Sequence, residues 1–160
     1  MPIFKHTLAA VVLTVAASAG AQPAQKTPDF TGQWELNASK SDLGGAPAPK
    51  LSASVTQNDT LFTFNQTVGT PAGDQTVTQA FPLKPGPQTW NTPSGQPVTT
   101  TATWENGSLV ITAKAQRQGT EMTQVNKWQL SPDGKSMTML QDMATPGGAV
   151  TLRLVFDRKS

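Results

Sequence analysis

The sequence contains no cysteine and no tyrosine, and its single histidine, His6, lies in an N-terminal segment that we expect to be removed. Without cysteine there is no disulfide, no thiolate metal site and no point for attaching a lipoprotein lipid. Without histidine, the remaining chain cannot use Ser-His-Asp or Cys-His catalysis, a histidine general base, or haem ligation through His, Cys or Tyr. We therefore expect neither an enzyme nor a cofactor nor a bound metal.

Charge and long apolar runs are also scarce. The whole chain carries a net charge of only +2, and its lysines and arginines are dispersed. Because nucleic-acid-binding surfaces concentrate positive charge, we expect no nucleic-acid partner. The longest apolar run, residues 8–17, is shorter than the roughly 20 residues that span a bilayer. No membrane span is therefore expected.

Residues 1–21 have the features of a signal peptide. Lys5 precedes the apolar run, and Ala19-Gly20-Ala21 forms a small-residue cleavage site, so we expect cleavage between Ala21 and Gln22. An uncleaved N-terminal anchor is the alternative. The pattern predicts an exported protein, periplasmic or extracellular, with a flexible tail over residues 22–28 and a single domain over residues 29–160.

Period-two alternation of apolar and polar residues recurs from residue 30 to the end, and no window shows a helical pattern. Between Leu152 and Phe156, for example, every second residue is apolar. Asn106-Gly107 separates two such runs and is a strong signal for a hairpin turn. Strands are expected over residues 30–37, 52–57, 60–68, 75–83, 98–104, 109–115, 120–130, 136–143 and 149–157, with residues 84–97 as the least regular segment.

Short turns make neighbours in sequence into antiparallel neighbours in space, so these strands predict an all-β up-and-down meander. About eight to ten such strands close into a barrel or fold into two packed sheets. Closure removes exposed strand edges, which favours the barrel. The alternative is a β-sandwich. We expect a monomer in either case.

The segment TGQW at the head of this meander, containing Gly32 and Trp34, resembles the first strand of the lipocalin-like members of the calycin superfamily. The combination of FTGQWELNASKSDLG, WENGSLVIT and WQLSPDGKSMTM is similar to a group of small exported bacterial proteins. The resemblance implies a barrel closed at one end by Gly32 and Trp34, with an arginine, Arg153 or Arg158, packed over the tryptophan. Unlike classical lipocalins, the chain has no cysteine and ends straight after a strand.

The inward faces of the predicted strands mix aromatic and methionine side chains with amides. Buried amides need hydrogen-bond partners, so their presence suggests an interior that holds a small hydrophobic molecule. We expect the ligand-binding residues to be Phe62, Phe64, Gln66, Gln79, Phe81, Met122, Gln124, Met137 and Met139. The alternative is a solidly packed, non-enzymatic module that binds a protein or glycan through its loops.

Three other features have competing interpretations. Met122, Met137, Met139 and Met143 can fill core gaps, line an apolar pocket, or bind Cu(I), and core filling is the interpretation we favour. Glu35, Glu105 and Glu121 are the carboxylates that a glycosidase would need, but their positions favour solvated faces. Trp90, in the irregular segment, is either a lid over the barrel mouth or a local anchor.

Overall fold

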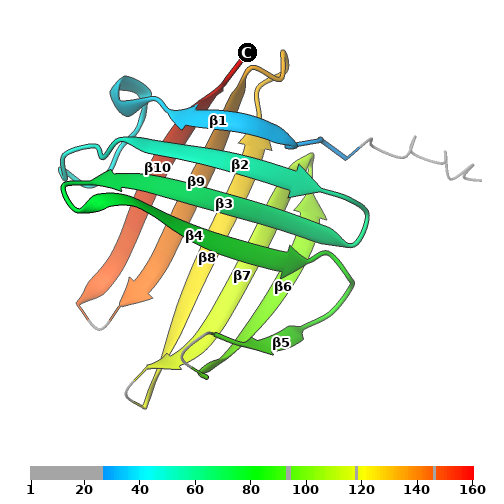
Figure 1. The fold of residues 1–160 in the computed structure, drawn as a ribbon. Helices are drawn as coiled ribbons and strands as arrows, with labels where there is room; N and C mark the ends of the chain where they lie inside the picture. Colours follow the sequence, from blue (N-terminus) through cyan, green and yellow to red (C-terminus); the bar gives the residue numbers. More distant parts are fainter. Residues whose placement is uncertain (1–26, 93–94, 118, 146) are drawn as a thin grey trace, which may run out of the picture.

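A computed structural model describes residues 27–92, 95–117, 119–145 and 147–160. The signal peptide expected over residues 1–21 and most of the tail expected over residues 22–28 lie outside these ranges. The described part consists of ten strands and one short 3-10 helix, η1 (Ala38–Lys40) (Figure 1). The strands are β1 (Gly32–Leu36), β2 (Leu51–Gln57), β3 (Leu61–Thr70), β4 (Gly73–Pro82), β5 (Gln88–Asn91), β6 (Pro97–Glu105), β7 (Ser108–Arg117), β8 (Thr120–Leu130), β9 (Ser136–Thr145) and β10 (Gly148–Arg158).

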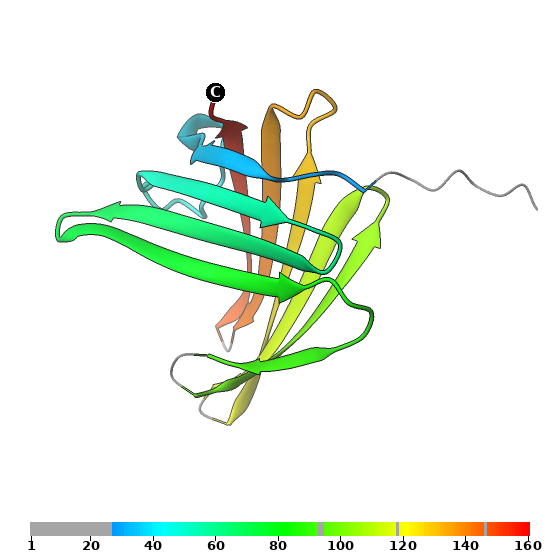
Figure 2. The same cartoon turned by 45° about the vertical axis from the view of Figure 1, so that its right-hand side comes forward.

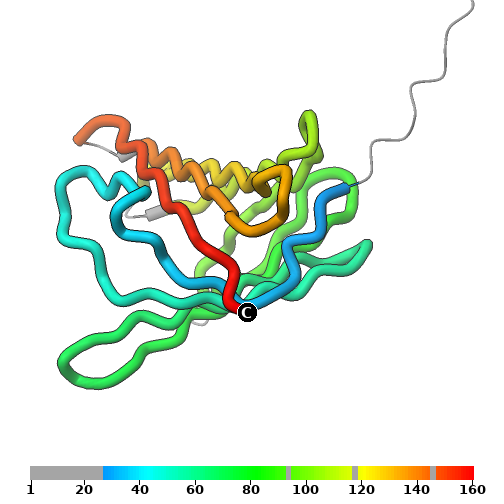
Figure 3. Tube along the Cα trace, turned by 90° about the horizontal axis from the view of Figure 1, so that it is seen from above, coloured from blue at the N-terminus to red at the C-terminus, as the bar shows by residue number. Residues whose placement is uncertain are grey.

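All ten strands form one antiparallel sheet in the order β4-β3-β2-β1-β10-β9-β8-β7-β6-β5. Every neighbour is the next strand in sequence, except that β1 pairs with β10 and so joins the two ends of the meander. Seen from above, β1–β4 and the C-terminal strands form two layers that meet where β1 runs beside β10 (Figure 3). The two sheet edges, β4 and β5, are consecutive in sequence. The predicted antiparallel meander and β-barrel are confirmed, and the barrel is nearly closed.

The predicted strands match the observed ones closely, with one omission. β5 lies inside residues 84–97, which the sequence presented as irregular. This strand has only four residues, and Trp90 is its one apolar side chain, so it carries no alternating pattern. The turn prediction at Asn106-Gly107 is confirmed, because both residues have positive φ, 49° and 77°, as a type I′ turn requires.

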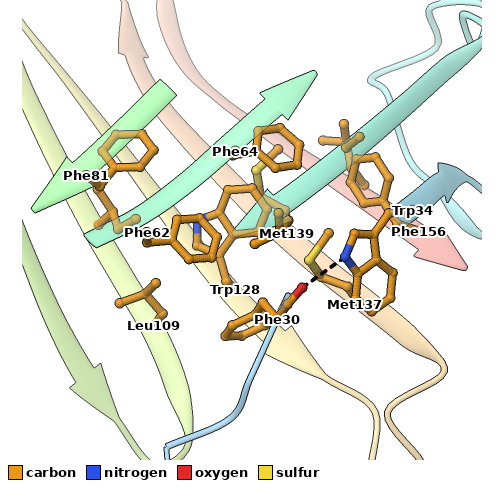
Figure 4. Packing of buried hydrophobic residues seen from close by; sticks show 14 of the residues in the cluster. Phe30, Trp34, Phe62, Phe64, Phe81, Leu109, Trp128, Met137, Met139 and Phe156 are labelled. Carbon is orange, nitrogen blue, oxygen red and sulfur yellow. Dashed lines mark hydrogen bonds between the residues drawn. The ribbon is translucent and has the colours of Figure 1, made fainter. Parts of the chain in front are cut away.

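One end of the barrel is packed solid with aromatic side chains (Figure 4). The ring of Trp128 lies 5.2 Å from Phe62 and 4.8 Å from Phe64, centroid to centroid, and Phe64 in turn contacts Phe156. All four are fully buried. Edge-to-face and tilted contacts of this kind add to the stabilisation from burial alone. This aromatic cluster is the hydrophobic core of the protein.

Gly32 and Trp34 lie at the packed end, where Arg158 covers them. The guanidinium carbon of Arg158 is 4.2 Å from the centroid of the Trp34 ring, and its Nη1 donates to the Thr31 carbonyl at 2.6 Å. The Trp34 Nε1 donates to the Phe30 carbonyl at 3.0 Å (Figure 4). Of the two candidate arginines, Arg158 is therefore the one over the tryptophan.

Glycine is required at position 32 for two reasons. Its φ is 148°, which L side chains rarely adopt, and a Cβ there would overlap Nη1 of Arg158. The glycine between Phe30 and Trp34 thus makes room for the arginine. The resemblance also implies that Gly32 and Trp34 close this end of the barrel, and that role stays a prediction.

Within the described residues, no helix has the length and apolarity needed to cross a bilayer.

Candidate ligand pocket

The other end of the barrel is hollow. A pocket of about 480 Å³ opens between β4 on one side and β5–β9 on the other. In Figure 2, β4 crosses in front of the C-terminal strands, and β5 lies below it. Phe81 belongs both to the core cluster and to the pocket wall, so it marks the boundary between the filled and the hollow end. A volume of this size lies within the usual range for small-molecule sites.

Apolar and uncharged polar side chains share the pocket wall. Trp90, Val98, Met122 and Met143 contribute apolar surface together with Phe81. Small residues on β7 and β9 leave the central space open. The remaining lining residues are Gln79, Thr92, Gln96, Thr100, Ala113, Ala115, Gln116, Thr123, Gln124, Asn126 and Ala144.

An amide pair on β8 forms the polar part of this wall. Gln124 and Asn126 are two residues apart and therefore share the inward face of the strand. The Gln124 Nε2 donates to the Asn126 Oδ1 at 3.1 Å, and Asn126 is only 2% exposed. On β4, Gln79 lines the pocket from the opposite wall and is partly exposed. The pocket thus presents amide donors and acceptors from two strands.

Four of the nine residues expected to bind a ligand line this pocket: Gln79, Phe81, Met122 and Gln124. The structure places Phe62, Phe64, Met137 and Met139 in the packed core instead. Gln66 is partly buried on β3, opposite Val77 of β4, and does not line the pocket. Alternation along a strand gave the inward face for all nine, and it carries no information about which end of the barrel is hollow. Ligand binding by any of them stays a prediction.

Several lining residues were not predicted. Ala113 and Ala115 leave space in the pocket because their side chains are small. A small apolar residue has no chemical group that would mark it as a binding residue in the sequence. Thr100, 2% exposed, lies on the inward face between Val98 and Ala102 and could have been found from that alternation. Met143 was among the methionines singled out, but was not assigned to the pocket.

Trp90 lies at the boundary between the inside and the outside of the barrel. It lines the internal pocket and also an outer groove of about 560 Å³ between β4 and β5, together with Leu61 and Ala80. Its exposure is 36%. This position at the rim of the pocket favours a lid over the barrel mouth rather than a local anchor.

The three glutamates considered for glycoside hydrolysis do not come together in the pocket. Glu35 pairs with Lys159 and Glu121 with Lys114, in exposed ion pairs at 3.5 Å and 3.4 Å, and Glu105 accepts from the Thr103 hydroxyl. None of the three lines the pocket. Within the described residues no group of histidine, cysteine, aspartate or glutamate side chains is placed to hold a metal ion.

The strand order and the pocket define the class: this is a ten-stranded, nearly closed antiparallel β-barrel with a hollow end. A scan of protein-family models gives no match to the sequence, and a search of the curated proteins gives none either. Solved structures with the same fold include apo lipid binding protein 8 of Caenorhabditis elegans, with a TM-score of 0.59 and 15% identity, covering 81% of this chain and 95% of that one.

Two further structures extend the likeness. Zebrafish ileal bile acid-binding protein complexed with cholic acid has a TM-score of 0.55 and 19% identity, covering 81% of this chain and 98% of that one. Secretory abundant heat soluble protein 4 from Ramazzottius varieornatus has a TM-score of 0.54 and 12% identity, covering 86% and 100%. At these identities the similarity shows the shared fold.

Proposed function

We propose that this protein binds a small, mostly apolar molecule non-covalently in the hollow end of its barrel. The observation that carries the proposal is the asymmetry of the interior, in which a solid aromatic cluster at one end is followed by an internal pocket of about 480 Å³ at the other. An apolar ligand in this pocket would remove the apolar wall from water, which favours binding. A wholly packed module would have no such pocket.

The wall chemistry and the structural neighbours support the same function. Met122 and Met143 are flexible and polarisable, and such side chains adapt to ligands of varied shape. Neighbours in fold include proteins named for fatty-acid transport and for bile-acid binding. Their shared fold makes ligand binding the first function to test in this chain.

We also propose that the activity is binding without catalysis. The carboxylates that could act as acid and base, Glu35, Glu105 and Glu121, are exposed and outside the pocket. The chain beyond the leader offers no histidine or cysteine to replace them. A ligand recovered unchanged after prolonged incubation with the protein would support this, and a converted product would contradict it.

Titration with the neutral fluorescent probe Nile red tests the binding proposal. We expect saturable binding, and we expect Ala113→Trp, which fills the pocket, to weaken it by about tenfold or more, equivalent to about 1.4 kcal/mol. The matched control is Ala72→Trp, which places the same side chain in the exposed turn between β3 and β4. Absence of saturable binding to the wild-type protein, or equal loss in both variants, would contradict the proposal.

We further propose that the chain is exported and that residues 1–21 are removed. The support is the sequence pattern of Lys5, the apolar run and Ala19-Gly20-Ala21. Expression with the native N-terminus, followed by fractionation and N-terminal sequencing, tests this. A protein outside the cytoplasm that begins at Gln22 is expected, and a full-length chain retained in the cytoplasm would contradict it.

A further inference from the structure

The pocket wall has polar groups but no charge. Among the described residues that line it, every polar side chain is an amide, a hydroxyl or the indole of Trp90, and none is Asp, Glu, Lys or Arg. Two charged residues next to lining residues, Lys114 on β7 and Glu121 on β8, pair with each other outside the pocket. Lys114 lies between Ala113 and Ala115 on β7, so it faces outward, where its Nζ is 3.4 Å from the Glu121 carboxylate. The described wall offers no counter-charge to an ionised ligand.

We propose that the ligand's polar group is uncharged, and that the site selects apolar molecules bearing a hydroxyl, ester or amide over fatty-acid anions. This inference rests on the proposed ligand-binding function and specifies its substrate class. Moving a carboxylate from water into a low-dielectric site is costly unless an opposite charge or several hydrogen-bond donors compensate. A neutral hydroxyl requires only one or two hydrogen bonds.

The amides are arranged to satisfy such a group. Because the Gln124 Nε2 already donates to Asn126, the Oε1 of Gln124 and its second N–H face no other partner among the described residues. Gln79 on the opposite wall adds a second amide. Each amide can both donate and accept, which matches a hydroxyl, whereas an ionised carboxylate only accepts. An ionised carboxylate in the pocket would place its negative charge beside the amide oxygens of Gln79 and Gln124, which is unfavourable.

Competition with a matched ligand pair tests the inference on the wild-type protein. Dodecanol and dodecanoate differ only at the head group, and both are titrated against bound Nile red at neutral pH, where the acid is ionised. We expect dodecanol to displace the probe at a concentration about tenfold or more below that of dodecanoate, because only the anion has to be desolvated without a counter-charge. Equal or stronger competition by dodecanoate overturns the inference while leaving the binding proposal intact. If the probe itself does not bind, the proposed function and this inference both fail.

A charge introduced into the wall gives a second, independent measurement. Gln124→Lys places a cation where we expect the ligand's polar group, so the preference should shift toward dodecanoate. Gln33→Lys makes the same change on the exposed outer face of β1 and should leave the wild-type preference unchanged. Retained β-structure by circular dichroism is confirmed for both variants first. A shift of the same size in both variants, or none in Gln124→Lys, would contradict a head-group site at Gln124.

Discussion

The side chain of Arg158, at the end of β10, connects the last strand to residues around the first strand. Its Nε donates to the Gly134 carbonyl at 2.8 Å and its Nη1 to the Thr31 carbonyl, while its guanidinium covers Trp34. The guanidinium suits this position because it can stack on a ring and donate hydrogen bonds in its plane at the same time. Gly32 is what allows it to approach. The first and last strands are thereby fixed to each other by side chains as well as by their backbone pairing.

Gly32→Ala should destabilise the fold by about 1–3 kcal/mol, because it combines backbone strain with displacement of Arg158. Gly73→Ala is the matched control: its φ is also positive, at 110°, but an added Cβ would meet nothing within 4 Å. Urea unfolding of both variants measures the difference. In an Arg158→Ala background the cost of Gly32→Ala should fall, and an unchanged cost would show that the arginine contact is unimportant.

Asp157 makes the stability of the packed end dependent on pH. A hydrogen bond from the Asn37 amide, with smaller contributions from Ser136 and Lys40, holds the pKa of Asp157 below its ordinary value of 3.8, against the opposing effect of burial. Since the folded-state pKa is the lower one, this stabilisation is present above pH 3.8 and is lost as the pH falls through the folded-state pKa. Asp157→Asn should therefore make the acid decline in unfolding free energy shallower. Asp59→Asn, in the exposed β2–β3 turn, is the control, and equal acid sensitivity in wild type and Asp157→Asn would contradict the prediction.

At the scale of elements, the sequence predicted those strands whose side chains alternate between core and solvent. Leu152, Leu154 and Phe156 mark β10 without ambiguity, and the Asn106-Gly107 turn fixes the β6–β7 hairpin. β5 could not be predicted, because its place depends on pairing with β6 rather than on its own pattern. The position of the pocket was equally hidden, since Phe64 and Gln79 are directly paired across β3 and β4 yet belong to the core and the pocket.

β5 should be the least stable strand of the barrel. It has four residues, pairs within the described structure only with β6, and carries no buried side chain. Strand β8, paired on both sides with β7 and β9, provides the internal comparison. Native-state hydrogen exchange should give much lower protection for the β5 amides than for those of β8, because edge strands with little burial open locally. Similar protection in both strands would show that β5 is held by contacts beyond its single ladder.

At the scale of the whole molecule, we expect the packed end of the barrel to provide most of the stability and the hollow end to provide the binding site. We expect Phe62→Ala, in the packed core, to lower the free energy of unfolding by about 3–5 kcal/mol. Met122→Ala, partly exposed in the pocket, should lower it by roughly 1 kcal/mol while changing Nile red affinity more strongly. Chemical unfolding and probe titration on both variants measure the two effects. Parallel losses of stability and affinity in the two variants would contradict this division.

The position of Trp90 gives the protein a built-in optical sensor. Trp34 and Trp128 are fully buried, and the partly buried Trp104 stacks on Phe30 away from the pocket, whereas Trp90 is 36% exposed and borders the pocket. In the ligand-free protein, a soluble quencher such as acrylamide should therefore reach its indole. An occupant seated against it would shield that indole and shift its emission to shorter wavelengths, so occupancy can be followed without any added label.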